Sequence, residues 1–413
     1  MEKANDGRST AAMRSGGRVL IFPNSNTLSH VSRALSLCNW LAAEGYEVHI
    51  GVSNSRKTWV QRFWPQCHGI LELWEPSGKP FPSPGWFSDP VYSEACVTSQ
   101  EAVIDLVRPD LIIGIFDFVS GISGGKIPRL SINGACMLPW YNGVLGFDDN
   151  ETPERCEQKK IFTLFWSYAA KSFGELLKKR NKEIPSSALE LLPGDVNCIY
   201  EIPEVTGITG VPPSYHYIGP IVWDGWDELG ETVPWPKRDR HFTVYLNSGT
   251  LMKNEQTMAS IINECLARGF RLVMSSGDRG PSWSTNRLFC RPFLAPSDVL
   301  PRADLVVCTG GVGACYMNLQ FGVPSLIIPM QPEQATNGIN LARTGCGEVY
   351  RHNVVFLGDA ERYHHPFDQK RFSALLDRMT ENREAYRGLH RIRTVLEGVK
   401  TRELLLSIIR GML

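Results

Sequence analysis

The chain alternates short apolar runs with helical patterns, and this alternation limits its possible folds more than any other feature. Residues 18–23 form an apolar, β-rich run, residues 31–41 repeat apolar side chains at helical spacing, and residues 46–52 form a second β-rich run. A strand, a helix and a strand in this order make a parallel pair with a right-handed crossover. The sequence therefore predicts an α/β fold built on parallel sheets.

The same alternation continues along the chain and restarts after an irregular stretch. Six further apolar runs are typical of strands, at 111–116, 127–132, 242–247, 271–275, 303–308 and 324–329. Residues 223–240 keep no period and are rich in Trp, Pro and Gly, which is typical of a linker between domains. Two repeating halves joined by a linker predict two doubly wound, Rossmann-like domains that face a central cleft.

This organisation divides the chain into five segments. They are a flexible leader (1–17), an N-terminal domain (18–222), the linker (223–240), a C-terminal domain (241–395) and a C-terminal helix (396–413). Ligands of such sheets bind beyond the carboxyl ends of the parallel strands, so the cleft between the domains is the expected site.

Two long stretches of the N-terminal domain carry less regular signals. Residues 59–90 are rich in aromatic residues and Pro, and they are predicted to form an irregular loop that is more often packed on the protein than in contact with a ligand. Residues 156–182 predict a long helix with a solvated, basic end.

The composition excludes several classes of protein. Among the 413 residues, 43 Lys and Arg balance 43 Asp and Glu, and this zero net charge argues against a protein built around nucleic-acid phosphates. No apolar run approaches the ~18 to 20 residues of a transmembrane segment, and the polar N-terminus does not resemble a signal peptide. The 11 Cys residues are scattered without a CxxC pair, which indicates neither a disulfide framework nor a zinc site and favours a reducing, cytoplasmic setting.

A glycine-rich turn carries the sharpest functional signal. Residues 309–314, Thr-Gly-Gly-Val-Gly-Ala, lie between the run 303–308 and a helix. The glycines let a ligand approach the backbone closely, and the helix N-terminus offers free N–H groups and a partial positive charge. This combination suits a phosphate or a diphosphate, although tight glycine turns of this kind also serve packing. The pattern is neither a P-loop nor GxGxxG.

A second polar segment follows the next predicted strand. Glu333 and Gln334 come shortly after the run 324–329, and together they can accept and donate hydrogen bonds. Such a pair suits the hydroxyl groups of a sugar. The same residues also fit a polar helix start with an acid near the N-terminal dipole, and the residues alone favour this second interpretation.

Residues 303–350 resemble the donor-binding region of GT-B glycosyltransferases of the UDP-glycosyltransferase type (family 1). The family's pattern runs His-Gly-Gly-x-Gly-Thr, a helix, Gly-Val-Pro, a strand, Pro-x-x-x-(Asp/Glu)-Gln and x-x-Asn. The matching positions are 309–314, Gly322-Val323-Pro324, Pro329, Glu333-Gln334, Asn337 and Gly345-Cys346-Gly347. Further similarities lie at 28–37, 45–48, 108–113 and 217–220, so the resemblance spans residues 18–350.

The resemblance implies the GT-B fold, with an acceptor-binding N-terminal domain, a nucleotide-sugar-binding C-terminal domain and a last helix that crosses back to the first domain. It also implies a set of donor-binding residues: Phe293, Thr309, Gly310, Gly311, Val312, Gly313, Glu333, Gln334 and Asn337. Ser248, Gly249 and Thr250 are further candidates because they lie in the first turn of the second domain, where they can face the diphosphate. Residues 248–250 fit a plain type II turn equally well. Phe293 lies where the family places the nucleotide base, but the residue alone fits the core slightly better.

Two positions depart from the family's pattern. The His of the glycine motif, which contacts the donor's phosphate in the family, is Thr309 here, and the closing Thr is Ala314. A Thr hydroxyl donates a hydrogen bond to a phosphate oxygen but brings no positive charge. Donor binding is therefore expected to differ in detail from that of the family.

His30 is the candidate general base. It lies in the turn between the run 18–23 and the first helix, where an imidazole can take a proton from an acceptor hydroxyl that attacks the donor's anomeric carbon. An acid behind the ring would fix its tautomer, and Asp117, just past the run 111–116, is the predicted partner. The resemblance implies the same pairing. Without the resemblance, a lone His at a helix start is more often a capping or solvated residue.

These patterns predict an inverting glycosyltransferase that moves a sugar from a UDP or dTDP donor to a hydroxyl acceptor. The N–H groups of Gly310, Gly311 and Val312 would meet the leaving diphosphate. No DxD pair lies in the turns that face the cleft, so a metal-independent reaction without a cofactor is expected.

Less specific features of the sequence bear on the acceptor and on two alternative functions. The apolar content of residues 59–90 and 137–170 favours a hydrophobic acceptor. One alternative is a catalytically silent sugar-nucleotide-binding or partner-activating GT-B protein, which Thr309 and Ala314 keep open. The other is a GT-B sugar-nucleotide 2-epimerase, which uses the same donor cleft without an acceptor.

Overall fold

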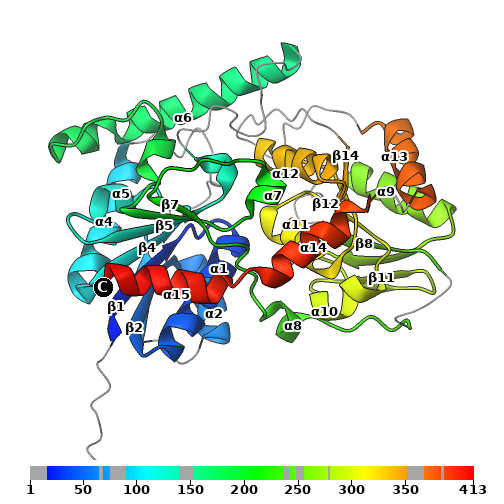
Figure 1. Cartoon of the computed structure of the whole chain (residues 1–413), viewed down its shortest axis with the longest axis horizontal. Helices are drawn as coiled ribbons and strands as arrows, with labels where there is room; N and C mark the ends of the chain where they lie inside the picture. The colour runs from blue at the N-terminus through cyan, green and yellow to red at the C-terminus, as the bar shows by residue number, and fades with distance from the viewer. Residues whose placement is uncertain are drawn as a thin grey trace, which may run out of the picture.

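Two seven-stranded sheets, one in each half of the chain, organise the structure (Figure 1). The computed structural model describes residues 16–64, 68–74, 90–138, 153–236, 241–247, 255–277, 280–350, 367–382 and 386–413. Helices cover the sheets, as parallel strands that are buried on both faces require. This arrangement confirms the predicted α/β class with two Rossmann-like sheets.

Neighbouring strands are parallel throughout the first sheet. From edge to edge its strands are β3 (Gly69–Leu73), β2 (Tyr46–Ser53), β1 (Gly16–Pro23), β4 (Leu111–Ile115), β5 (Arg129–Asn133), β6 (Val196–Ile199) and β7 (Tyr215–Tyr217). The second sheet repeats this plan, with one antiparallel pair, β10 with β11, at its edge. Its strands are β10 (Trp283–Ser284), β11 (Leu288–Arg291), β9 (Arg271–Ser275), β8 (Thr243–Asn247), β12 (Leu305–Cys308), β13 (Ser325–Ile327) and β14 (Gly347–Val349).

Helices connect the strands in both halves. Those of the first half are α1 (Leu28–Ala43), α2 (Asn54–Phe63), α4 (Pro90–Val107), α5 (Ser120–Ser123), α6 (Pro153–Lys179) and α7 (Pro203–Thr206), with 3₁₀ turns η1 (Ala135–Met137) and η3 (Ala188–Leu191). Those that follow are α8 (Trp226–Leu229), α9 (Glu255–Ala267), α10 (Pro296–Val299), η5 (Leu300–Arg302), α11 (Val312–Phe321), α12 (Pro332–Arg343), α13 (Gln369–Glu381), α14 (Gly388–Gly398) and α15 (Thr401–Met412).

The central strand β1 shows why its sequence is apolar without alternation. Val19 and Ile21 belong to the core cluster shared with α1, whereas Leu20 and Phe22 belong to a cluster on the other face with residues of α4. All four side chains are fully buried. A strand with a helix on each face has no solvent-exposed side, so the residues in its buried part, Val19–Pro23, are all apolar.

Each sheet has one point at which the order of its strands reverses. In the first sheet the chain runs from β1 to β2 and β3 and then returns to the other side of β1 as β4. In the second sheet β8 and β12 have the same relation. Loops leave a parallel sheet in opposite directions at such a point and open a crevice beyond the carboxyl ends of the two strands. These two crevices are where a site is expected.

The segment 59–90 is more regular than the sequence predicts. Trp59 and Phe63 lie one turn apart on α2, with their ring centroids 5.0 Å apart. Residues 69–73 form β3, which pairs with β2 at the edge of the sheet. The prediction of an irregular loop is therefore wrong for these residues, because the aromatic spacing is helical and a five-residue edge strand gives little signal. Residues 75–89 lie outside the described residues.

The two halves are joined by contacts that come from distant parts of the chain. The backbone N–H of Ile202 donates to the hydroxyl of Tyr316 on α11 at 3.0 Å. Arg343 of α12 donates from Nη2 to the carbonyl oxygen of Val205 at 2.8 Å. α11 and α12 are thereby fixed against the segment that follows β6.

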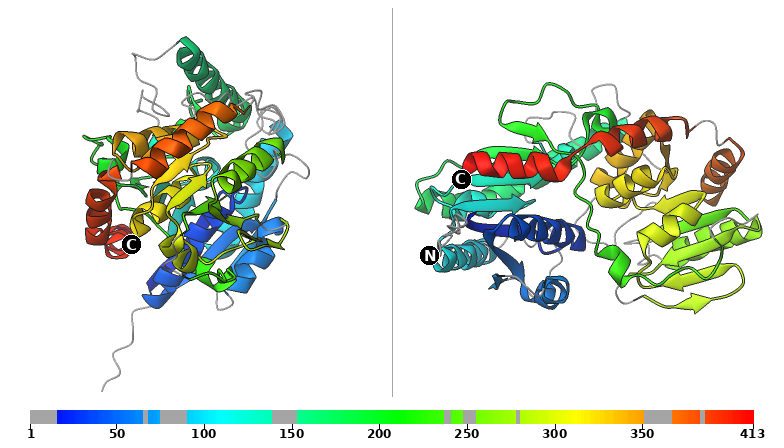
Figure 2. Two further views of the ribbon diagram at one scale, coloured as in Figure 1. Left: turned by 90° about the vertical axis from the view of Figure 1, so that its right-hand side faces the viewer. Right: turned by 60° about the horizontal axis from the view of Figure 1, so that its bottom comes forward.

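The last two helices run along both halves (Figure 2). α14 packs on α11 of the second half. α15 continues to the first half, where Arg402 and Arg410 form ion pairs with Glu44 at the end of α1. The final helix therefore connects the second half back to the first sheet.

Two neighbouring leucines on α15 allow its packing to be tested. Leu405 is 1% exposed and Leu404 is 42% exposed. Leu405→Ala is expected to lower the free energy of unfolding by about 2–5 kcal/mol, because it leaves a cavity in the core. Leu404→Ala is expected to change it by less than about 0.5 kcal/mol. Urea unfolding of both variants measures the difference, and equal effects would contradict the packing of α15 described here.

Candidate active site between the two sheets

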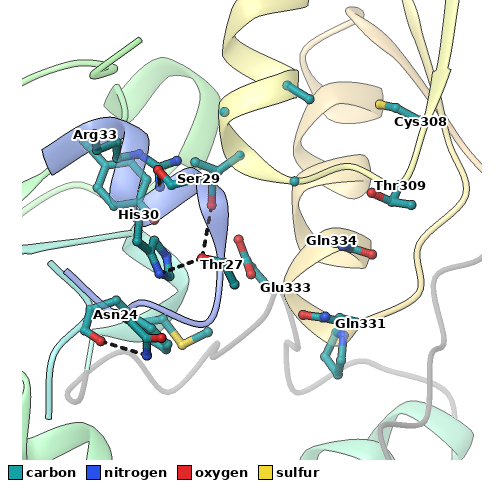
Figure 3. A pocket seen from close by; sticks show the side chains of 18 of the residues that line it. Asn24, Thr27, Ser29, His30, Arg33, Cys308, Thr309, Gln331, Glu333 and Gln334 are labelled. Carbon is teal, nitrogen blue, oxygen red and sulfur yellow. Dashed lines mark hydrogen bonds between the residues drawn. The ribbon is translucent and has the colours of Figure 1, made fainter. Parts of the chain in front are cut away.

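The two strand-order reversals open onto one cavity of about 350 Å³ (Figure 3). The first half contributes His30 and Arg33 of α1 together with aromatic side chains that include Phe116 and Trp166. The second half contributes the glycine turn after β12 and the first turn of α12. Segments that the sequence predicts to carry the chemistry thus lie around one space.

The turn that follows β12 depends on glycine at one position. Gly310 has a φ of 89°, and a Cβ atom there would lie 2.5 Å from Cγ2 of Ile327 and 3.0 Å from the carbonyl oxygen of Gln334. Only glycine combines this left-handed backbone with this lack of space. Asn337 Nδ2 donates to the carbonyl oxygen of Gly310 at 2.8 Å and holds the turn from α12.

α11 begins directly after this turn, with its N-terminus at the cavity. Gly311 is the N-cap residue and provides no side-chain hydrogen bond, and a Cβ atom there would meet open space. Val312, Gly313 and Ala314 line the cavity. The first N–H groups of a helix have no partner within the helix and carry a partial positive charge. This end of α11 therefore offers hydrogen-bond donors and a positive potential to an anion.

His30 lies on the first turn of α1 and faces the same cavity (Figure 3). Its Nδ1 lies 2.8 Å from Oγ1 of Thr27, and its ring centroid lies 5.2 Å from that of Phe116. Burial lowers the pKa of His30 to about 3, the charge of Arg33 acts in the same direction, and a hydrogen bond with the Asn24 backbone opposes both. The imidazole is therefore neutral near pH 7.

Asp117 follows β4 at the same edge of the sheet, but it is engaged elsewhere. Its carboxylate accepts hydrogen bonds from Nε2 of Gln100 at 3.1 Å and from the backbone N–H groups of Val119 and Ser120 at 3.2 and 3.1 Å. Across the described part of the chain, His30 and Asp117 share no hydrogen bond. The predicted pair is not formed because backbone N–H groups at the start of α5 take the carboxylate, and His30 bonds to Thr27 and the Asn24 backbone instead.

The backbone between β4 and Asp117 is strained. Phe116 has a φ of 50°, in the left-handed region that a bulky residue rarely adopts. The strand therefore ends at Ile115, one residue earlier than the sequence predicts. Phe116 lines the cavity beside His30, and strained residues of this kind cluster at functional sites.

A cluster of buried polar side chains lies beside the cavity. The guanidinium of Arg33 lies 4.0 Å above the ring centre of Tyr200, and Glu201 is only 3% exposed. Burial raises the pKa of Glu201 to about 8, and the neighbouring Glu333 adds to this effect. Burial also raises the pKa of Glu333, against the opposing charge of Arg33. The two carboxyl groups thus hold protons more strongly than ordinary glutamates.

The three predicted donor-binding residues of α12 have different environments. Glu333 and Gln334 line the cavity, and Oε1 of Gln334 also accepts a hydrogen bond from the Met330 N–H at 2.8 Å. Asn337 is buried and does not line the cavity. In this structure the Asn337 side chain holds the turn at Gly310. The sequence predicts that this side chain binds the donor, but it is used within the protein.

A second cavity, of about 360 Å³, adjoins the first and shares Arg33 and Gly313 with it. Phe293 lines this cavity and also contacts Trp59 and Trp226, with ring centroids 5.9 and 6.2 Å away. The side chain is half-buried, so it belongs both to an aromatic cluster and to a cavity wall. Ser248, Gly249 and Thr250, which are also predicted to bind the donor, lie outside the described residues.

Sequence reasoning missed Thr27, Arg33 and Glu201. Arg33 had a signal, because it interrupts the apolar face of the first predicted helix one turn after His30. Thr27 also had a sequence signal, because it is a hydroxyl residue three positions before His30. Glu201 had none, because only the fold brings the end of β6 to α12.

Within the described residues, no helix combines the length and the apolar content needed to cross a membrane. The same part of the chain contains no group of three or more His, Cys, Asp or Glu side chains arranged to hold a metal ion.

Comparison with other sequences finds glycosyltransferases. No protein-family model matches the chain. A PGL/p-HBAD biosynthesis rhamnosyltransferase of Mycobacterium bovis is 22% identical over 361 residues, which cover 81% of this chain and 77% of the relative. An uncharacterized UDP-glucosyltransferase, YojK of Bacillus subtilis, is 25% identical over 146 residues, 33% of this chain and 35% of the relative.

Solved structures share the fold across the whole chain. The calicheamicin glycosyltransferase CalG4 superposes with a TM-score of 0.69 at 13% identity, and the match covers 97% of this chain and 98% of that chain. The spinosyn rhamnosyltransferase SpnG, complexed with spinosyn aglycone, superposes with a TM-score of 0.67 at 14% identity over 95% and 99%. The resemblance to GT-B glycosyltransferases and the GT-B fold, both predicted from the sequence, are confirmed.

The two adjacent glycines of the turn are expected to respond differently to substitution. Gly310→Ala should lower the free energy of unfolding by about 1–3 kcal/mol, because alanine is strained at positive φ and lacks space there. Gly311→Ala, at a φ of −59° with open space around it, should have little effect on stability. Thermal unfolding of both variants checks this, and equal losses would contradict the described turn.

The buried, neutral His30 predicts a dependence of stability on pH. The pKa is 6.5 in the unfolded chain and about 3 in the folded chain, so between these values only the unfolded state binds the proton. Stability therefore falls as the pH falls through this window. Between pH 7 and pH 5 the wild type should lose roughly 1–2 kcal/mol more than His30→Gln. Urea unfolding at the two pH values measures this, and equal losses would contradict the burial of a neutral ring.

Proposed function

We propose that this chain, a glycosyltransferase with the GT-B fold, transfers a sugar with inversion from a UDP or dTDP donor to a hydroxyl group of an apolar acceptor, without a metal ion and with His30 as general base. The observation that carries this proposal is the single cavity onto which both His30 and the N-terminus of α11 open. One wall suits a leaving diphosphate, and the other provides a neutral imidazole for the incoming hydroxyl.

In the proposed reaction the acceptor oxygen attacks the anomeric carbon from the side opposite the diphosphate. The new bond from the acceptor oxygen to that carbon forms as the bond from the carbon to the diphosphate oxygen breaks, which inverts the centre. The hydroxyl proton passes to His30. The electron pair of the broken bond leaves on the diphosphate, where the N–H groups at the start of α11 stabilise the charge.

Thr27 would orient the base in place of a carboxylate. When Nδ1–H of His30 donates to Oγ1 of Thr27, at 2.8 Å, the lone pair of Nε2 is left to accept the proton. A hydroxyl fixes the tautomer as a carboxylate would, but it stabilises the imidazolium less. The base then gains most of its driving force from the negative charge of the bound donor.

The donor is proposed to occupy both cavities. Its sugar hydroxyls would bind Glu333 and Gln334 in the first cavity, and its base would lie beside Phe293 in the second. Support comes from a neighbour of known structure, the spinosyn rhamnosyltransferase SpnG complexed with thymidine diphosphate, and from the relative that is named a UDP-glucosyltransferase. The proposal therefore includes both uracil and thymine as the nucleobase of the donor.

The acceptor is proposed to be apolar because of the side chains on the first-half wall. Phe116, Met137, Phe165 and Trp166 line the cavity beside His30. A wall of this composition binds an apolar or aromatic molecule and leaves few polar groups to satisfy. SpnG, which has the same fold, is solved with a spinosyn aglycone.

A reducing, cytoplasmic setting is part of the same proposal. Nine cysteines among the described residues are buried thiols that take part in no disulfide. Free buried thiols are typical of proteins that remain in a reducing compartment.

A silent nucleotide-sugar-binding protein is the second candidate, and one observation favours it. His30 lacks the carboxylate partner that the family resemblance implies, since Asp117 caps α5. A binding protein has no need of that partner.

A transfer assay separates the candidates. Purified protein is incubated with UDP-hexoses and dTDP-hexoses and a panel of phenolic and aliphatic alcohols, and free nucleotide and glycoside are measured by mass spectrometry. His30→Gln is expected to lower kcat at least ~100-fold, with the Kd for the nucleotide within about twofold of wild type. His216→Gln, on the edge strand β7 and outside the cavity, is the matched control and should keep full activity.

Three outcomes would contradict the proposed function. Wild type that binds nucleotides but releases none with any acceptor would favour the silent protein. A donor that changes configuration without an acceptor would favour the epimerase. A His30→Gln variant that keeps its activity would exclude His30 as the base.

A further inference from the structure

Arg33 is a buried cation that neither the predicted motifs nor the proposed catalytic step uses. It lies on α1, one turn after His30, and is only 4% exposed. The same side chain lines both cavities, so it lies where they meet. Figure 3 shows it extending from α1 toward α11.

The contacts of Arg33 within the protein leave part of its guanidinium unused. Nη1 donates to the carbonyl oxygen of Ser29 at 3.3 Å, and the group lies over the ring of Tyr200. Nε is buried and has no hydrogen-bond partner among the described residues. A buried guanidinium normally satisfies its donors, because an unpaired buried charge is costly. A buried guanidinium with an unpaired donor, on a residue that lines a cavity, therefore points to a ligand.

The nearby carboxyl groups do not remove this need. Glu201 and Glu333 both interact electrostatically with Arg33. Burial raises the pKa of Glu201 to about 8 and raises that of Glu333 as well, so both groups have a greater share of the neutral form. Their negative charge offsets that of Arg33 only in part.

Arg33 also approaches the positive end of a helix. Its Nη2 lies 3.6 Å from the position that a Cβ atom would take on Gly313, in the first turn of α11. A cation beside a helix N-terminus is repelled by the helix dipole, and the N-cap residue of α11, Gly311, provides no side-chain hydrogen bond there. Two positive groups that face one cavity from different halves favour the binding of an anion between them.

We propose that Arg33 is the cation that binds the diphosphate of the donor, opposite the N-terminus of α11. This inference rests on the proposed function and adds a binding residue to it. Thr309 supplies no charge at the position where the pattern of the family that this sequence resembles has a His, and Arg33 supplies it from the other half. Because an arginine presents a planar fork of donors, Arg33 can bond two phosphate oxygens at once.

One consequence concerns the two halves of the protein. α1 belongs to the first half and α11 to the second, so a diphosphate that contacts both links them. Donor binding would then hold the cleft closed around the acceptor. Loss of Arg33 should remove this link while Phe293 and the other side chains around the proposed base site remain in place.

The test compares diphosphates with nucleosides, because only the diphosphate carries the negative charge that Arg33 would bind. Isothermal titration calorimetry is run with UDP and uridine, and with dTDP and thymidine, on wild type, Arg33→Met and Arg33→Lys. Arg33→Met is expected to weaken the diphosphate at least tenfold and the nucleoside less than twofold. Arg33→Lys keeps the charge but loses the fork, so its loss for the diphosphate should be about threefold to tenfold.

Arg343→Met is the matched control, since Arg343 also joins the two halves but lines neither cavity. It should leave the ratio of diphosphate to nucleoside affinity unchanged. If Arg33→Met fails to fold, the Arg33→Lys variant decides the question by the same ratio.

The outcomes separate this inference from the proposed function. An unchanged affinity ratio in the Arg33 variants would assign Arg33 a structural role and overturn the inference. If the affinity ratio changes in the Arg33 variants but the wild type transfers no sugar, the inference about Arg33 is supported and the proposed function is overturned. A wild type that binds neither UDP nor dTDP would overturn both.

Discussion

The left-handed turn at Gly310 is the constraint on which the site depends. Its backbone allows β12 to pass into α11 within three residues, so the helix N-terminus lies at the carboxyl edge of the sheet. Asn337 and the tight fit against Ile327 fix this direction from two other elements. Without that orientation the positive end of α11 would not face His30, and the two halves would share a boundary without sharing a binding site.

Electrostatics joins the parts of the site into one system. The positive charge of Arg33 and burial together keep His30 neutral, which leaves the ring able to accept a proton but makes it a weak base. An anionic donor beside Arg33 would offset that charge and strengthen the base. In the proposed enzyme the donor therefore prepares the general base before the acceptor reacts, and Thr27 takes the place of the predicted carboxylate beside Nδ1 of His30.

Much of the fold was predictable because buried parallel strands and amphipathic helices leave strong local patterns. The runs at 18–23, 46–52, 242–247 and 271–275 all form strands. Edge strands such as β3 and β7 were missed because they are short and only half-buried. Of the site, the glycine turn was identified from its local pattern and His30 chiefly from the family resemblance, and both lie at the cavity. The hydrogen bonds of Asp117 were not predictable, because they depend on whether α5 begins within reach of the carboxylate. The cluster of Arg33 and Glu201 was not predictable either, because it depends on contacts between segments far apart in the sequence.

The central claim is that residues at the two strand-order reversals, one in each sheet, act on one bound donor. A crystal structure with UDP tests this claim most directly. The diphosphate should lie against the N–H groups of the first turn of α11, with Arg33 on its other side and His30 facing the space where the sugar would begin. A diphosphate found away from α11, or a closed wall between it and His30, would contradict the claim.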